Sequence, residues 1–129
     1  MRPVVNAAHA DVAVDIHADG GPPDGRGFTI LEPVPDGPND AVVAPSDNFA
    51  TVLRDTFAAT TPMPVSDYDS IGGLQPRNDL AGLNLTTVPK VLIECGNMRN
   101  ATDARLLTSA AFQQRAARAM AAAITAFLR

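Results

Sequence analysis

Two short segments of the chain carry an ionisable side chain where an apolar run ends. Residues 89–100 are Pro-Lys-Val-Leu-Ile-Glu-Cys-Gly-Asn-Met-Arg-Asn, so Glu94 follows an apolar run and precedes a glycine and a turn. Residues 15–19 are Asp-Ile-His-Ala-Asp, which puts the imidazole of His17 between two aspartates. A carboxylate and an imidazole in such places offer one base and one metal-type ligand, which is half of what a zinc hydrolase site needs.

The pattern around each of these residues predicts a strand. Residues 91–95 are apolar on both faces apart from Glu94, which is typical of a strand covered on both sides in an α/β sheet. Glu94 is then expected at the carboxyl end of its strand, where open α/β sheets bind ligands. Residues 12–19 alternate between apolar and polar types, so we expect Ile16 and His17 on opposite faces. The apolar set is Val12, Val14 and Ile16, and the polar set is Asp11, Asp15, His17 and Asp19.

Neither residue is diagnostic by itself. A glutamate at the end of a strand also occurs as a helix cap or a surface acid. A histidine near aspartates also occurs as a hydrogen-bonded structural residue. The candidate roles of Glu94 and His17 therefore depend on the residues around them.

Three motifs carry a resemblance to a known family. They are Ile-His-Ala-Asp-Gly-Gly at 16–21 followed by Gly-Arg-Gly-Phe at 25–28, Arg-Asn-Asp-Leu-Ala-Gly-Leu-Asn-Leu at 77–85, and Leu-Ile-Glu-Cys-Gly-Asn-Met-Arg-Asn at 92–100. Over nearly its whole length the chain resembles the zinc-dependent N-acetylmuramoyl-L-alanine amidases that cleave peptidoglycan, in the form found in mycobacteria and relatives. The resemblance implies an α/β fold of phosphorylase/hydrolase-like type, with a mixed central sheet flanked by helices.

The resemblance also implies roles for the two candidate residues. His17 matches a zinc ligand of the family, and Glu94 matches the base that takes a proton from water and returns it to the leaving amine of L-alanine. The bond that such enzymes cleave joins the lactyl group of N-acetylmuramic acid to the stem peptide. The implied substrate is therefore peptidoglycan, and the implied location is outside the cytoplasm, at the cell wall.

The ligand set that the family uses is only partly present. Its members also bind zinc through a first His in a Gly-His-Gly or Gly-His-Asn turn and through a Glu some tens of residues later. Because the chain contains only the second His, as His17, we expect a single domain over residues 1–129 that lacks the first βα units and has an incomplete zinc site. A non-catalytic amidase-like module that binds peptidoglycan or a partner is the alternative. A serine hydrolase is a distant third, because Ser70 lacks the Gly-x-Ser-x-Gly frame.

Neither His9 nor Asp15 is expected to replace the missing zinc ligands. His9 falls in a variable helix-to-strand connection of the family and is expected in a surface loop. Asp15 shares a strand face with His17 but replaces a small serine of the family, so we do not assign it as a ligand. Arg2 and Asn6 are expected at the end of the helix that precedes the His17 strand.

Composition excludes several classes of function. The chain has 129 residues, of which 46% are hydrophobic and 19% are charged, which suits one domain with a core. Its formal net charge of -4 argues against a nucleic-acid partner, which would need clustered Lys and Arg. No apolar run approaches the ~20 residues of a membrane span, and the first residues do not form a signal peptide. The single cysteine, Cys95, is expected to pack in the core.

The remaining sequence predicts a mixture of helices, strands and loops. Residues 28–31 are expected to form a strand, residues 32–45 to be irregular, and residues 60–75 to be rich in loops. Ser46 is a candidate N-cap for a helix that runs to about Ala59.

Two further helices are expected nearer the end of the chain. A short helix is predicted within residues 77–85, where Arg77 and Asp79 form either an exposed ion pair or part of a wall near Glu94. From about Ser109, an apolar stripe predicts a helix packed on the sheet, rather than one that lies on a membrane surface. The stripe consists of Phe112, Ala116, Ala119, Met120, Ala123, Ile124 and Phe127.

Overall fold

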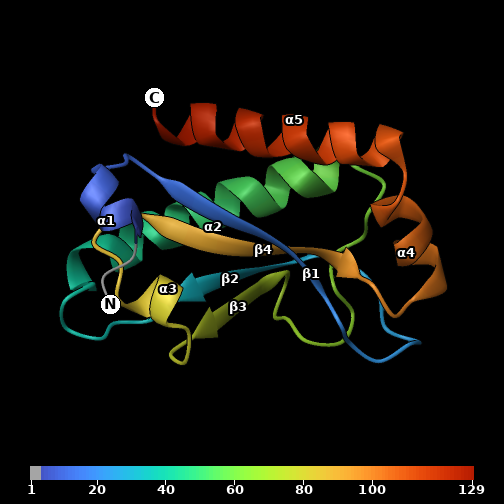
Figure 1. Ribbon diagram of the computed structural model, residues 1–129, viewed down its shortest axis with the longest axis horizontal. Helices are drawn as coiled ribbons and strands as arrows, with labels where there is room; N and C mark the ends of the chain where they lie inside the picture. Colours follow the sequence, from blue (N-terminus) through green and yellow to red (C-terminus); the bar gives the residue numbers. More distant parts are fainter. Residues whose placement is uncertain (1–3) are drawn as a thin grey trace.

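A four-stranded mixed sheet forms the centre of the molecule (Figure 1). The computed structural model describes residues 4–129, and its strands lie in the order β1-β4-β2-β3. Strand β4 (Lys90–Asn97) is parallel to β1 (Ala13–Asp19) and antiparallel to β2 (Thr29–Pro33), which in turn is parallel to β3 (Leu74–Arg77). The expected α/β fold with a mixed sheet flanked by helices is confirmed, and β1 and β3 are its edges.

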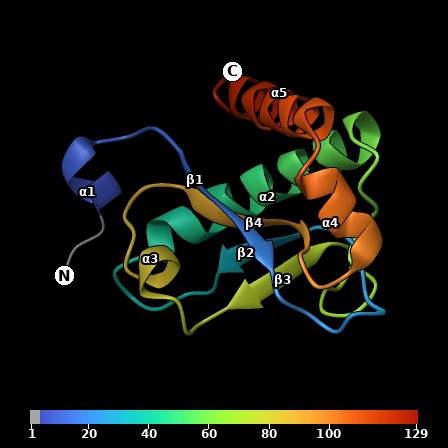
Figure 2. The ribbon, with the colours of Figure 1, turned by 45° about the vertical axis from the view of Figure 1, so that its right-hand side comes forward.

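Helices flank this sheet on both sides. The two long helices, α2 (Asp40–Thr60) and α5 (Ala110–Phe127), pack against each other over one face of the sheet (Figures 1 and 2). The short helix α3 (Ala81–Asn84) contacts β2 and β4. The remaining helices are α1 (Val4–Ala8), which precedes β1, and α4 (Ala101–Leu107), which follows β4. No helix within residues 4–129 is long and apolar enough to cross a membrane.

Aromatic rings and alanines fill the space between the two long helices and the sheet. The rings of Phe28 and Phe57 lie with their centroids 4.7 Å apart, and Phe112 meets Phe57 edge to face at 6.3 Å. Alanines on the buried stripe of α5 let that helix approach α2 closely, as Ala-rich stripes do. The helix begins where expected, because the Ser109 side chain accepts a hydrogen bond from Phe112 N. Packing of α5 on the core is therefore confirmed.

The expectation that residues 32–45 are irregular is wrong for residues 40–45, which are helical. Helix α2 begins at Asp40, so Pro45 lies inside it rather than before it. A proline this near the helix start removes only one intrahelical hydrogen bond, which the packing of the helix compensates. Ser46 is not the N-cap but is buried, and its Oγ accepts a hydrogen bond from Lys90 N at 3.0 Å.

Some other sequence-based expectations differ from the structure. Residues 74–77 form strand β3 rather than loop, because they pair with β2. The short helix predicted within residues 77–85 is confirmed as the single turn of α3. The turn after β4, at residues 98–100, leads into α4, a helix that was not expected. Ile16 lies on the apolar face as expected but is 63% exposed, because β1 is an edge strand.

The region before β1 agrees with expectation where the structure describes it. Asn6 lies in α1, and its side-chain Nδ2 donates to Leu85 O at 3.1 Å. His9 is exposed in a turn with a φ of 51°, as a surface loop residue. Arg2 lies outside the described residues.

Candidate functional site

The pairing of β1 with β4 brings the two candidate residues together. In this parallel register His17 lies directly opposite Glu94. Residues opposite each other in a sheet project from the same face, so the imidazole and the carboxylate share the face that α2 and α5 do not cover. Glu94 lies three residues before the end of β4 at Asn97, so it is close to the strand's carboxyl end rather than at its last position.

The surroundings of Glu94 favour its protonated form. Burial of the carboxyl raises the pKa of Glu94 above its ordinary value, and the charges of Asp19 and Asp69 raise it further. His17 and Arg77 act in the opposite direction, because positive charge favours the carboxylate. The Glu94 Oε2 atom is buried and has no hydrogen-bond partner among the described residues. A half-buried carboxyl with a raised pKa and an oxygen left without a partner is equipped to exchange protons with a ligand.

Tyr68 forms one wall beside these residues. Its hydroxyl donates a hydrogen bond to Asp19 Oδ2. Its ring lies against Gly21 and Gly25, where an added Cβ would come within 2.5 Å and 2.7 Å of ring atoms, so only glycine fits at either position. The sequence analysis did not identify Tyr68 or Asp69, because they come from the loop-rich segment 60–75 and no spacing connects them with Glu94.

Asn97 and Asp103 hold the glycine-rich loop of residues 20–27 against the end of β4. The Asn97 side-chain amide donates to Pro22 O and Gly25 O, both at 2.8 Å, and its oxygen accepts from Gly21 N at 3.0 Å. The fully buried Asp103 carboxylate lies 2.9 Å from Arg26 Nε and also accepts from Gly27 N and Asn97 N. Gly-Arg-Gly and Glu-Cys-Gly-Asn thus contribute to one hydrogen-bond network, in which Asp103 of α4 connects them.

Two ion pairs flank the site. Asp15 Oδ2 lies 3.1 Å from the buried Nζ of Lys90, so Asp15 has a partner on its own sheet face and does not hydrogen-bond His17. Arg77 binds Asp79 through two hydrogen bonds of 2.7 Å and 2.6 Å. This pair is partly exposed, and Arg77 is also near enough to Glu94 to lower its pKa. The ion pair between Arg77 and Asp79 is confirmed, whereas their part in a wall near Glu94 stays a prediction.

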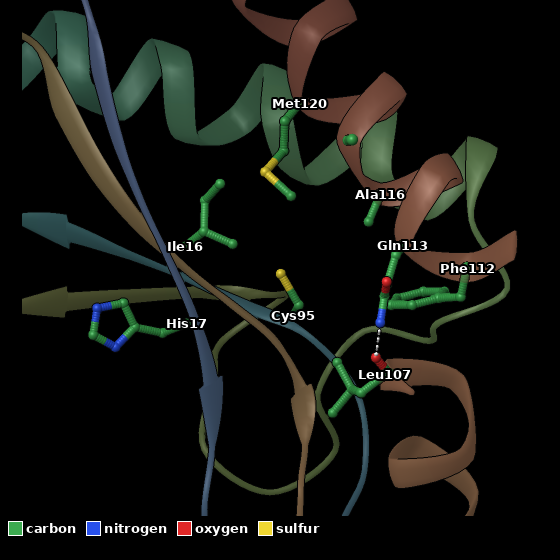
Figure 3. A pocket seen from close by; sticks show the side chains of 9 residues that line it. Ile16, His17, Cys95, Leu107, Phe112, Gln113, Ala116 and Met120 are labelled. Carbon is green, nitrogen blue, oxygen red and sulfur yellow. Dashed lines mark hydrogen bonds between the residues drawn. The ribbon is translucent and has the colours of Figure 1, made fainter. Parts of the chain in front are cut away.

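The opposite face of β1 borders an apolar cavity (Figure 3). Its volume is about 300 Å³, and its wall includes Ile16, Cys95, Phe112 and Met120. Figure 3 shows the His17 imidazole on the other side of the β1 ribbon from Ile16, Cys95 and Met120. His17 is also among the residues that border the cavity, so the cavity adjoins the strand that carries His17, although the imidazole projects from the other face.

The donor atoms near His17 are fewer than a catalytic zinc requires. Within residues 4–129, no group of three or more His, Cys, Asp and Glu side chains is arranged to hold a metal ion. Catalytic zinc normally has three protein ligands. The described residues thus provide one exposed imidazole and one adjacent carboxyl, but not a complete coordination sphere.

Comparison with known proteins assigns the family. A sequence model of the N-acetylmuramoyl-L-alanine amidases matches residues 3–126. The chain belongs to the N-acetylmuramoyl-L-alanine amidase family. The amidase Rv3717 of Mycobacterium tuberculosis is 41% identical over 126 residues, which are 97% of this chain and 51% of that protein.

Solved structures of amidases share the fold. The amidase Ami1 of Mycobacterium smegmatis superposes with a TM-score of 0.90 at 46% identity, over 97% of this chain and 57% of that one. The CwlD amidase of Clostridioides difficile, solved with the GerS lipoprotein, gives a TM-score of 0.79 at 22% identity over 97% of this chain and 58% of that one, which supports the fold alone. The chain thus spans about half the length of the curated relative.

Proposed function

We propose that the chain supplies one side of a zinc-dependent peptidoglycan amidase site, with His17 as a metal ligand and Glu94 as the proton acceptor. The reaction is hydrolysis of the amide between N-acetylmuramic acid and L-alanine of the stem peptide, at the cell wall. The observation that supports it best is the parallel register that sets His17 opposite Glu94, whose Oε2 atom is buried without a partner.

The proposed division of labour follows from the chemistry of the two side chains. A zinc ion on His17 would supply a Lewis acid and a water of lowered pKa. Glu94 has a raised pKa, so its carboxylate can take a proton from water and its acid form can return the proton to the leaving amine. Because His17 is a single ligand, the remaining ligands must come from protein outside the described residues.

The mechanism needs Glu94 and His17 in different roles, which a pair of variants separates. The assay uses a chimera in which the part of the M. tuberculosis relative that this chain does not match is joined to the chain. Glu94→Gln keeps the shape of the side chain but removes the proton acceptor, so cleavage of a muramoyl-peptide should fall by about 10²- to 10⁴-fold while zinc content stays unchanged. His17→Ala should lose zinc and activity together.

A control variant accompanies the two variants of the chimera, and one result would contradict the proposed role of Glu94. His9→Ala is the matched control, because His9 is the other histidine of the chain and is exposed in a turn. It should keep both zinc and turnover. Near-normal turnover of Glu94→Gln would refute the role of Glu94 as base and leave its motif as evidence of fold only.

A non-catalytic amidase-like module is the second candidate function. The observation that favours it is the lack of a three-ligand group within residues 4–129. Binding of the 129-residue chain to purified peptidoglycan, unchanged by chelator and by Glu94→Gln, would support this candidate over the enzyme.

A further inference from the structure

A tight turn presents an aliphatic side chain beside strand β3. Ile71 N donates to Leu74 O at 3.0 Å, and Leu74 N donates to Ile71 O at 3.1 Å. Between them Gly72 and Gly73 have φ values of 57° and 83°, which favour glycine and are typical of two-residue hairpin turns. Ile71 is 86% exposed, so a turn of defined shape carries an isoleucine that the described residues leave largely uncovered.

Side chains from outside the turn hold it in place. Arg54 Nη1 donates to Gly72 O at 3.1 Å, and Ser70 Oγ accepts from Gly73 N at 3.2 Å. A side chain on a backbone that is already fixed loses less conformational freedom when it binds a ligand. Ile71 is therefore pre-organised for an apolar contact.

Ile71 borders a hollow at the edge of the sheet. The hollow has a volume of about 360 Å³, and its walls come from residues 68–71 and 74–76. Strand β3, which supplies the second of these segments, is the edge opposite β1 in the strand order. The hollow is therefore formed without any contribution from the β1 side of the sheet.

The strand register places this hollow next to the candidate site. Thr29 is opposite Glu94, and Leu31, two residues further along β2, is opposite Gln75. Alternate residues of a strand share a face, so Gln75 projects from the same face as Glu94. Neighbouring strands lie about 4.8 Å apart, which puts β3 about 10 Å from β4. A group bound in the hollow thus lies one small ring away from the Glu94 carboxyl.

The lining of the hollow combines apolar surface with hydrogen-bond acceptors. None of the described residues that line it carries a positive charge. Asp69 Oδ1 accepts from Ser66 Oγ at 2.6 Å, and a carboxylate can accept further hydrogen bonds from a ligand. The apolar part consists of Ile71, Leu74 and Pro76, and the polar part includes Tyr68, Asp69 and Gln75.

This lining suits the sugar end of a muramoyl-peptide better than the peptide end. The lactyl carboxyl of N-acetylmuramic acid is bound in the amide, so the sugar end has no charge and offers hydroxyl donors, ring CH groups and an acetyl methyl. The stem peptide carries free carboxylates, which would meet like charge from Asp69 and from Asp19, the hydrogen-bond partner of Tyr68. Like charges brought together at a binding surface oppose binding.

We propose that the hollow of residues 68–71 and 74–76 is the subsite for the N-acetylmuramoyl ring, with Ile71 against its apolar groups and Asp69 accepting a hydrogen bond from a sugar hydroxyl. This assignment rests on the proposed amidase reaction and states which part of that substrate lies on the β3 side of Glu94. The stem peptide then extends away from the hollow.

An NMR titration of the 129-residue chain tests the subsite without any need for turnover. The probe is the carboxamide of N-acetylmuramic acid, which is uncharged like the sugar end of the substrate. It should shift the backbone amides of residues 68–75, and Ile71→Ala should weaken its binding by about three- to tenfold through loss of apolar contact. Leu128→Ala is the matched control, because Leu128 is a 51% exposed aliphatic residue at the end of α5, and it should leave the affinity unchanged.

A second probe separates sugar from peptide. L-alanyl-D-glutamate, an anionic fragment of the stem peptide, should not shift the amides of residues 68–75. Shifts with this dipeptide instead of the sugar, or no shifts of these amides with the sugar, would overturn the proposal.

Kinetics of the chimera test the same assignment on the whole substrate. Two substrates are compared, a muramoyl-peptide and the same peptide with only a lactyl group in place of the sugar. Ile71→Ala should lower kcat/KM for the muramoyl-peptide alone. Asp69→Asn should lower the ratio of kcat/KM for the two substrates by about fivefold, because a neutral amide accepts a weaker hydrogen bond than a carboxylate. The ratio is used because both substrates share Glu94, which Asp69 influences.

Failure of the subsite and failure of the proposed function give different results. A ratio that neither variant changes, in a chimera that cleaves both substrates, would overturn the subsite and leave the hydrolysis in place. A chimera that cleaves neither substrate would refute the proposed function, while the NMR titration still decides whether the hollow binds the sugar.

Discussion

Glu32 shows that a buried carboxyl in this fold is not by itself a sign of function. It lies in β2, is 7% exposed, and its Oε2 atom has no hydrogen-bond partner among the described residues. Burial raises the pKa of Glu32 to about 7, with further contributions from the adjacent Asp47 carboxyl, while Arg54 opposes the shift. Glu94 shares the burial but also faces an imidazole across the β1–β4 pair. The imidazole of His17 beside Glu94, rather than burial of the carboxyl, distinguishes the candidate site from the surroundings of Glu32.

Glu32 should make the stability of the protein depend on pH. Because its pKa is about 7 in the folded chain and 4.5 in the unfolded one, the folded state binds the proton more tightly. The free energy of unfolding should therefore be greatest below about pH 4.5 for this group, fall as the pH rises through about 7, and end lower by about 3 kcal/mol. Glu32→Gln should remove this fall and be more stable than the unsubstituted chain above about pH 7.

Urea unfolding at a series of pH values measures the effect. Asp36→Asn is the control, because Asp36 is exposed in the loop before α2. An unsubstituted chain and a Glu32→Gln variant with the same pH slope would show that Glu32 ionises in the folded state as it does in water.

At the scale of single residues, the sequence identified Glu94 and His17 and missed their neighbours. Each candidate ends a local pattern that can be recognised within a few positions. Tyr68 and Asp69 reach the site only because a long loop folds back across the sheet, a non-local event that leaves no periodic signal. Asp15 was identified as a neighbour of His17, but its contact with Lys90 depends on strand register.

At the scale of elements, α4 is a short helix that begins with a side-chain cap. It has seven residues, too few to be stable by propensity. The Asn100 side chain accepts hydrogen bonds from Thr102 N at 3.0 Å and Asp103 N at 3.1 Å. Asp103 in turn holds Arg26, so the cap of α4 also positions the glycine-rich loop beside the site.

Loss of this cap should be measurable. Asn100→Ala should lower the free energy of unfolding by about 1 kcal/mol. Ser109→Ala at the start of α5 should cost less, because its side chain accepts only one longer hydrogen bond, 3.3 Å from Phe112 N. The two variants are compared by urea unfolding at neutral pH. An equal or smaller loss in Asn100→Ala would show that tertiary packing alone fixes α4.

The sequence predicted the elements whose apolar residues recur with a regular period, but not those that depend on pairing with distant residues. Strand β4 and helix α5 have patterns that packing reinforces, so both agree with expectation. Strand β3 is short and contains Pro76, so only its pairing with β2 makes it a strand. The start of α2 was obscured by Pro45, which local rules treat as a boundary although α2 continues through it.

At the scale of the whole molecule, the count of ligands limits what the 129-residue chain can do alone. One imidazole leaves most of a zinc ion's coordination sphere to water, so binding should be weak and easily lost. We expect less than one zinc per chain after dialysis and no release of peptide from purified peptidoglycan.

Elemental analysis and a peptide-release assay check this expectation. His17→Ala should remove the residual zinc, whereas His9→Ala should retain it. Stoichiometric zinc together with peptide release from the chain would contradict the expectation, and would mean that ligands are assembled from residues that the described fold keeps apart.

The location of Cys95 has a practical consequence. It is the chain's single thiol, it is 6% exposed beneath α5, and burial raises its pKa to about 12. Thiol reagents attack the thiolate, so in the native state Cys95 should react very slowly. Reaction then requires that α5 separate from β4 or that the whole chain unfold. The rate at which an alkylating reagent labels this sulfur therefore measures how often the protein opens, and no cysteine has to be introduced for the measurement.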